Sequence, residues 1–230
     1  MSLRSYVIAR LLLTIPMIML LLTFVFLVVR VLPGDPASLH FEKQVNPEML
    51  LEFKRQLGLD KPIEIQYVEY LAGLLRGDFG KSMQDFSPVS QQIFSAFPAT
   101  LELAIFSTII MVLVGVVLGV QASRSYNSVQ DHSVRIFGIG SYAIPVFFLG
   151  EVLIMIFAIY LHLFPAGDRI YPGMDPTGLN LGGVHWSTGL YTIDSILEGS
   201  PSKFTMSLRY LFLPSLTLGT VLCGIFIRLT

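Results

Sequence analysis

The sequence predicts an all-α integral membrane protein: a multi-span helical bundle with four spans in this chain and an external helical segment after the first span. Three observations predict this class. The 230 residues are 53% hydrophobic, only 13% of them are charged, and four long apolar segments interrupt the chain. A soluble domain has roughly 25% charged residues. Because lipid offers the backbone no hydrogen-bond partner, long apolar segments cross a bilayer as helices.

The first span is the uncharged run between Arg10 and Arg30, which has 19 residues. At about 1.5 Å per residue it extends about 28 Å, close to the roughly 30 Å of the hydrocarbon core. A signal peptide is the alternative, but its apolar region would be shorter and an A-x-A-like cleavage site would follow. The other spans are predicted at about 99–123, 136–163 and 210–228.

Charges in the short flanks predict the orientation of these spans. Residues 1–10 contain two arginines and no acidic residue, and the 122–135 connector contains two arginines and one aspartate. By the positive-inside rule both flanks are cytoplasmic. We therefore expect residues 1–30 to form the first transmembrane helix with a cytoplasmic N-terminus. Residues 31–98 form an external amphipathic-helix segment, and residues 164–209 are also external.

Two helices are predicted within the first external segment. Asn46 is the expected N-cap of one helix, which ends at Gly58, while the other opens at Pro62 and ends at Gly77. The two helices are expected to fold onto each other or to lie on the membrane surface. The apolar stripe of the second helix consists of Ile63, Tyr67, Tyr70, Leu71, Leu74 and Leu75. The later external segment is rich in Gly, Pro and Asp, so turns are expected there.

The sequence RGDFGKS, Arg76–Ser82, ends like a phosphate-binding P-loop but does not fit one. The P-loop pattern requires a glycine where this chain has Leu75, and a strand where a helix is predicted. Nucleotide binding by this stretch is therefore rejected. Gly77 is instead the expected helix end and Gly80 a turn residue.

The composition also argues against several other classes. The net charge of −1 gives no basic surplus for nucleic acid. The single cysteine cannot form an internal disulfide, and the four histidines show no metal-ligand spacing such as HExxH. No cofactor and no metal site are expected in this chain.

A few residues inside the predicted spans carry more specific expectations. Gly115 and Gly119 form a G-x-x-x-G pattern that lets another helix approach closely. Glu151 is an intramembrane acid, which is costly and typical of a bundle interior or a water-filled path; the equal alternative is an acid close to the external interface or paired with a partner helix. Pro145 is expected to kink the third span. Glu102, at the external end of the second span, is expected to be a solvated boundary charge.

Four stretches, in this order and spacing, resemble a known family. They are RVLPGDP (Arg30–Pro36), LGLDKPIEIQYVEYLAGLLRGDFGKS (Leu57–Ser82), FPATLELAIFSTIIMVLVGVVLGVQAS (Phe97–Ser123) and YAIPVFFLGEVLI (Tyr142–Ile154). Together they resemble the permease subunits of binding-protein-dependent ABC importers in the dipeptide/oligopeptide/nickel class, which have the type I importer fold.

The resemblance implies a subunit that translocates its substrate by alternating access and has no enzymatic activity of its own. Its partners would be a second homologous permease, two cytoplasmic ABC ATPase subunits that hydrolyse ATP, and an extracytoplasmic substrate-binding protein. The location would be the prokaryotic cytoplasmic (inner) membrane. Candidate residues along the transport path are Tyr142, Pro145, Phe147 and Glu151.

The resemblance also implies a longer complete subunit with six spans. Residues 99–230 would be the N-terminal part of its transmembrane domain, without the cytoplasmic coupling loop (an E-A-A…G pattern) and the last two spans. Import of di- or oligopeptides is the first hypothesis for its function. Import of nickel or a nickel chelate is the alternative within the family, and a non-transporting membrane scaffold or sensor is the alternative from another class. A membrane enzyme is not favoured, because it would need titratable residues that converge at one depth, and apart from Glu102 at the end of the second span only Glu151 stands inside a predicted span.

Overall fold

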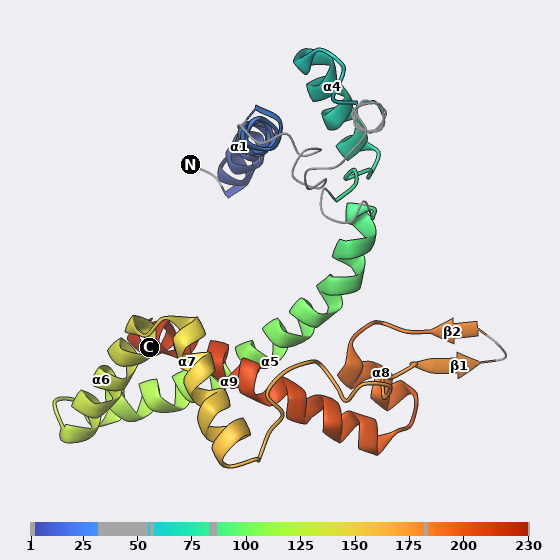
Figure 1. The fold of residues 1–230 in the computed structure, drawn as a ribbon. Helices are drawn as coiled ribbons and strands as arrows, with labels where there is room; N and C mark the ends of the chain where they lie inside the picture. Colours follow the sequence, from blue (N-terminus) through green and yellow to red (C-terminus); the bar gives the residue numbers. More distant parts are fainter. Residues whose placement is uncertain (1–2, 32–54, 56–57, 83–86, 182–183, 230) are drawn as a thin grey trace, which may run out of the picture. The chain divides into compact units, whose positions relative to one another are not determined.

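The computed structural model describes residues 3–31, 55, 58–82, 87–181 and 184–229 (Figure 1). The chain divides into two compact units, Met1–Ile93 and Phe94–Thr230. In chain order the elements are α1 (Leu3–Val31), α4 (Ile63–Leu75), α5 (Val89–Arg124), α6 (Val129–Ala143), α7 (Val146–Leu153), the π-helix η1 (Ile154–Tyr160), β1 (Leu179–Leu181), β2 (Val184–Trp186), α8 (Tyr191–Leu197) and α9 (Pro201–Leu229).

The predicted class, an all-α multi-span membrane bundle, is confirmed. Three helices, α1, α5 and α9, are long and apolar enough to cross a membrane, with mean hydropathies of 2.8, 2.8 and 1.9. The bent pair formed by α6 with α7 and η1 makes a fourth candidate. Most large apolar side chains on α1 are exposed, which suits a helix surrounded by lipid rather than by protein.

In the first unit, α4 packs against the C-terminal third of α1. The hydroxyls of Thr23 and Tyr67 are 2.6 Å apart, and a guanidinium nitrogen of Arg30 donates to the amide oxygen of Gln66 at 3.1 Å. The ring of Phe26, which is buried, meets Tyr67 edge-on at 5.1 Å. Part of the predicted apolar stripe of α4 therefore covers the end of the first span.

The end of α4 explains the RGDFGKS stretch. The amide of Asp78 donates to the carbonyl of Gly73 at 2.9 Å, and that of Gly77 donates to Leu74 at 3.1 Å, which is the Schellman pattern of a helix C-terminus. Gly77 has a φ of 79°, which only glycine adopts readily. Gly80 follows in a turn closed by the Asp78 carboxylate, as the sequence predicts. The helix predicted from Asn46 lies outside the described residues, apart from its end near Gly58, whose φ is 64°.

The second unit is built around α9. Helices α6 and α7 contact α9, and so does α8. Figure 1 shows α6 and α7 near the C-terminal end of α9, with α8 and the β-hairpin near its N-terminal end. The hairpin pairs Leu179 with Trp186, Asn180 with His185 and Leu181 with Val184.

The third predicted span, 136–163, is not one continuous helix. Helix α6 ends at Ala143, Pro145 is the N-cap of α7, and the two helical segments meet at 102°. The predicted interruption at Pro145 is confirmed, but it is a complete break between two helices rather than a kink in one. The reason is local: Ile144 precedes proline and is extended, with a ψ of 127°, because a helical conformation would clash with the proline ring.

The other helices are longer than the predicted spans. Helix α5 begins at Val89 rather than near residue 99, and α9 begins at Pro201 rather than near residue 210. Both extensions add polar turns to the N-terminal end of an apolar run. The 164–209 segment also contains more regular structure than expected, because it holds the hairpin, α8 and the first turns of α9.

Candidate functional site: a polar network and the helix contacts of the second unit

Glu102 of α5 is the centre of a polar network, and its burial corrects the sequence prediction. Its side chain is only 6% exposed. One carboxylate oxygen accepts from the backbone amide and the hydroxyl of Thr192, at 2.7 and 2.6 Å. The other accepts from Arg169 at 3.0 Å. Glu102 is thus a buried, fully bonded carboxylate and not a solvated boundary charge.

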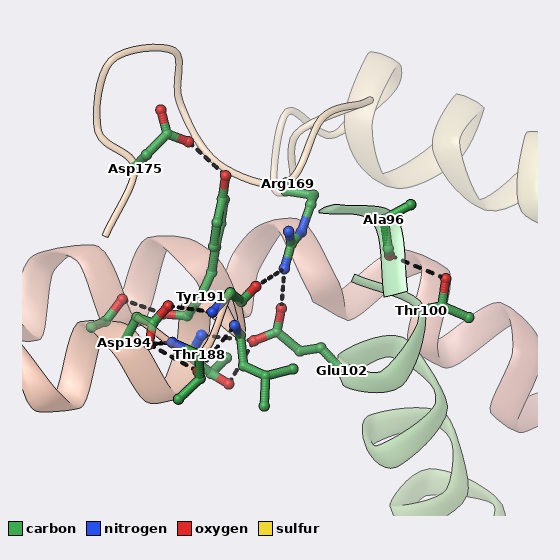
Figure 2. A network of polar contacts seen from close by, with 12 residues as sticks. Ala96, Thr100, Glu102, Arg169, Asp175, Thr188, Tyr191 and Asp194 are labelled. Carbon is green, nitrogen blue, oxygen red and sulfur yellow. Dashed lines mark hydrogen bonds and ion pairs between the residues drawn. The ribbon is translucent and has the colours of Figure 1, made fainter. Parts of the chain in front are cut away.

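Arg169 lies in the 164–200 segment and joins this segment to the Glu102 carboxylate. The same guanidinium nitrogen that bonds Glu102 also donates to the carbonyl of Gly189 at 3.0 Å. The guanidinium lies 3.9 Å from the ring centroid of Tyr191, within cation–π range. Figure 2 shows the guanidinium directed at Glu102, beside the Tyr191 ring. Burial, followed by a hydrogen bond to Asp175, raises the pKa of Tyr191 above its usual range.

Asp194 organises the loop before α8. Its side chain is fully buried and accepts four hydrogen bonds of 2.8–2.9 Å. The donors are the hydroxyl of Ser187, the amide and hydroxyl of Thr188, and the amide of Gly189. A buried carboxylate without such donors would be strongly destabilising. The loop that presents Gly189 to Arg169 is therefore held in one conformation (Figure 2).

A further set of bonds ties the 164–200 segment to the first turn of α9. Lys203 pairs with Glu198 at 2.6 Å and also donates to the carbonyl of Asp175 at 3.3 Å. The amide of Thr177 donates to the other oxygen of Glu198 at 3.0 Å. The hydrogen bond from Lys203, followed by that from Thr177, holds the pKa of Glu198 below its usual range.

The helices of the second unit meet at glycines. A Cβ atom added to Gly115 of α5 would lie 3.0 Å from the Cβ of Phe226 in α9, and one added to Gly219 would lie 2.7 Å from Ile110. Gly224 of α9 approaches α6 still more closely, because an added Cβ would be 2.5 Å from the carbonyl of Gly138. Such approaches are typical of helix pairs in membranes, where small residues permit backbone contact.

A cavity of about 910 Å³ opens between the C-terminal ends of α5 and α9 and the length of α6. It is lined by Gly119, Ala122, Ser123, Tyr126, Asp131, Arg135, Gly138, Ile139, Tyr142, Ala143, Gly224, Ile225 and Ile227. Arg135 pairs with Asp131 at 2.7 Å on its wall. The cavity brings together Tyr142 and Gly119, two of the residues singled out from the sequence.

The remaining predicted site residues lie elsewhere. Pro145 caps α7, while Phe147 and Glu151 are exposed side chains on that helix and do not line this cavity. Among the described residues no group of three or more His, Cys, Asp or Glu side chains could hold a metal ion.

Sequence reasoning missed Arg169, Thr192 and Asp194. Arg169 lies in the stretch expected to form turns, and Thr192 and Asp194 follow directly after it. The partner of Arg169 and Thr192 is distant, since Glu102 and Thr192 are separated by 90 residues. The one available signal was an acidic residue at the end of an apolar run, because such a residue needs a partner if the chain folds over it.

Comparisons with known proteins agree with this architecture. Residues 3–104 match the family model described as the N-terminal part of the membrane component of binding-protein-dependent transport systems. The chain is 36% identical over 203 residues to a probable D,D-dipeptide transport system permease protein of Escherichia coli K12, covering 88% of this chain and 58% of that protein. It is 32% identical over 227 residues to a di/tripeptide transport system permease protein of Pseudomonas aeruginosa, covering 98% and 65%.

A glutathione transport system permease protein of Salmonella choleraesuis is 38% identical over 161 residues, covering 70% of this chain and 53% of that protein. The chain thus spans between about half and two thirds of the length of these relatives. Fold and comparisons define a multi-pass helical membrane protein of the transport class. The chain belongs to the family of binding-protein-dependent transport system membrane components, and the relatives that it matches are named as permeases for D,D-dipeptides, di- and tripeptides, and glutathione.

Proposed function

We propose that this chain is part of the permease subunit of an ATP-driven importer of di- or oligopeptides. The observation that carries the proposal is the similarity to peptide permeases along 88–98% of the chain. The several apolar helices joined by glycine contacts support it, since a translocation path is formed between such helices.

The proposed subunit is not an enzyme and binds no cofactor of its own. ATP hydrolysis is assigned to two cytoplasmic ABC ATPase subunits, and substrate delivery to an extracytoplasmic binding protein. A second homologous permease would complete the path, which opens alternately to the two sides. Substrate choice would then rest largely with the binding protein.

The proposed location is the prokaryotic inner membrane with a cytoplasmic N-terminus. The bonds from Glu102 to Thr192 and Arg169 support this topology. They join the N-terminal part of α5 to the 164–200 segment, and both regions are expected outside the cell. A fusion after Arg124 should be active with a reporter that functions only in the cytoplasm. An insertion at Gly173 should be active only with a reporter that functions outside the cytoplasm.

Residues of the break between α6 and α7 are proposed to line the path: Tyr142, Pro145, Phe147 and Glu151. The exposed carboxylate of Glu151 on an apolar helix supports this assignment. Glu151→Gln should lower the rate of peptide uptake while the amount of protein in the membrane stays unchanged. Unchanged uptake would instead assign Glu151 to a role at the helix surface.

The substrate class is tested by competition. In proteoliposomes containing the full subunit and its partners, unlabelled dipeptide should compete with the uptake of labelled dipeptide, whereas free amino acids and Ni²⁺ should not. Competition by Ni²⁺ or its chelate alone would favour the nickel alternative. Absence of any uptake, with correctly assembled partners, would favour a scaffold or sensor.

A further inference from the structure

Helix α4 exposes apolar side chains that packing against α1 does not use. Val68 is 64% exposed and Leu75 90% exposed. In water such side chains on a short helix would be unfavourable, and their role depends on where α4 lies relative to the membrane.

The contacts between α4 and α1 indicate how deep the side chains of α4 lie in the membrane. Thr23 and Phe26 lie within the uncharged run that ends before Arg30. At about 1.5 Å per residue they are about 10 Å and 6 Å inward of Arg30 along the helix axis. Tyr67 bonds Thr23 and packs on Phe26, and Tyr70 lies 5.6 Å from the Phe26 ring. The side chains of α4 therefore reach the level of the outer acyl chains.

The arrangement of residues around α4 fits this depth. At 100° per residue, Tyr67 and Tyr70 share the face towards α1, whereas Gln66 and Glu69 are on a polar face to one side. Val68, Leu71 and Leu75 share the opposite side, onto which Glu64 also projects from the first turn. From Gln66 onward, α4 has the span on one face, polar groups on a second and aliphatic groups on a third, which matches the surroundings at a membrane–water boundary.

We propose that α4 is an interfacial helix that lies in the outer leaflet beside α1 and places Val68, Leu71 and Leu75 among lipid acyl chains. The occupant of this face is thus lipid and not another protein subunit. Continuity with the exposed, lipid-facing surface of α1 supports the choice. This inference rests on the proposed orientation of α1, with a cytoplasmic N-terminus, and is independent of which solute is transported.

Spin labelling tests the proposal, because Cys223 is the only cysteine and can be replaced by alanine. Val68→Cys and Leu75→Cys would each carry a nitroxide in the full chain, assembled with its partner subunits in liposomes. Glu69→Cys, 100° away on the same helix, is the matched control. Relaxation by O₂, which partitions into lipid, is compared with relaxation by a water-soluble Ni²⁺ chelate.

At positions 68 and 75 the effect of O₂ should exceed that of the Ni²⁺ chelate, and at position 69 the order should reverse. Dominance of the Ni²⁺ chelate at 68 and 75 would place this face in water and overturn the proposal. Protection from both reagents would mean that protein covers the face, which would also overturn it. The readout needs no ATP, so a failure of peptide transport would leave it unaffected.

Discussion

The charges of Glu102 and Arg169 compensate each other at a site where the carboxylate is buried, whereas most charged pairs lie in water at the protein surface. The carboxylate is 6% exposed and the guanidinium 33% exposed. Removing one partner of a buried pair leaves an uncompensated charge, which costs about 3–5 kcal/mol when both groups are fully buried. Partial solvation of Arg169 lowers that cost here.

Arg169→Met should therefore destabilise the protein by about 2–3 kcal/mol, at or just below the lower limit for fully buried pairs. Adding Glu102→Gln should recover part of the loss, because the neutral amide oxygen still accepts from Thr192 without leaving a buried charge. The measurement is thermal unfolding of the purified chain in detergent. Arg124→Gln, at the exposed C-terminal end of α5, is the control. A double variant less stable than Arg169→Met would contradict this explanation.

Glu198 is expected to make the 164–200 segment sensitive to acid. Its pKa is lowered in the folded protein, so its contribution to stability is present above the unfolded value of about 4.3 and is lost as the pH falls below it. Protonation removes the charge that Lys203 pairs with. The unfolding temperature should fall between about pH 5 and pH 3, and less steeply in Glu198→Gln. Equal pH dependence of the two proteins would contradict a role for Glu198.

At the scale of elements, the packing of α6 on α9 depends on individual glycines. Gly138 and Gly224 face each other across the pair, but the space at the two positions differs. An added Cβ at Gly224 would meet the hydroxyl of Ser141 and, at 2.5 Å, the carbonyl of Gly138, while at Gly138 the nearest atom would be 3.6 Å away. Gly140, on the same helix, has no atom within 4 Å.

The same substitution should thus have opposite effects at these positions. Gly224→Ala should destabilise the α6–α9 pair by about 1–3 kcal/mol, the usual cost of overpacking. Gly140→Ala should be neutral or stabilising by up to about 1 kcal/mol, because alanine is the better helix former. Gly138→Ala is the intermediate case. Thermal unfolding of the three variants is the measurement, and equal stability of Gly224→Ala and Gly140→Ala would refute the close contact.

Some features of these elements could be predicted from the sequence and others could not. Long apolar runs predicted the membrane helices, because transfer of a helix into lipid depends on the hydropathy of the whole segment. Gly77 predicted the end of α4, because the positive φ of a helix terminus depends on the residue at that position. The break at Pro145 was underestimated, since proline alone does not determine whether a helix bends or ends. The network of Glu102, Arg169 and Asp194 was not predictable, because it depends on how the 164–200 segment folds back over α5.

At the scale of the whole molecule, the external segment and the helices behave as a connected structure in the second unit. Glu102 ties the segment to α5 and Lys203 ties it to α9, while Arg209 of α9 donates at 2.8 Å to the carbonyl of Leu163, the residue that precedes the segment. The rings of Phe164 and Phe212 stack at 4.6 Å beside this bond. If α5 and α9 move relative to each other, the 164–200 segment must therefore move with them or these bonds must break.

The most direct test of the central claim is accumulation of a labelled dipeptide in proteoliposomes that contain the full subunit, its homologous permease, the ATPases and the binding protein. The protein is predicted to accumulate dipeptide above the external concentration only when ATP is supplied to the ATPase side. Omission of ATP, or inactivation of the ATPase subunits, should abolish accumulation. Equal uptake with and without ATP would contradict the assignment as an ATP-driven importer permease.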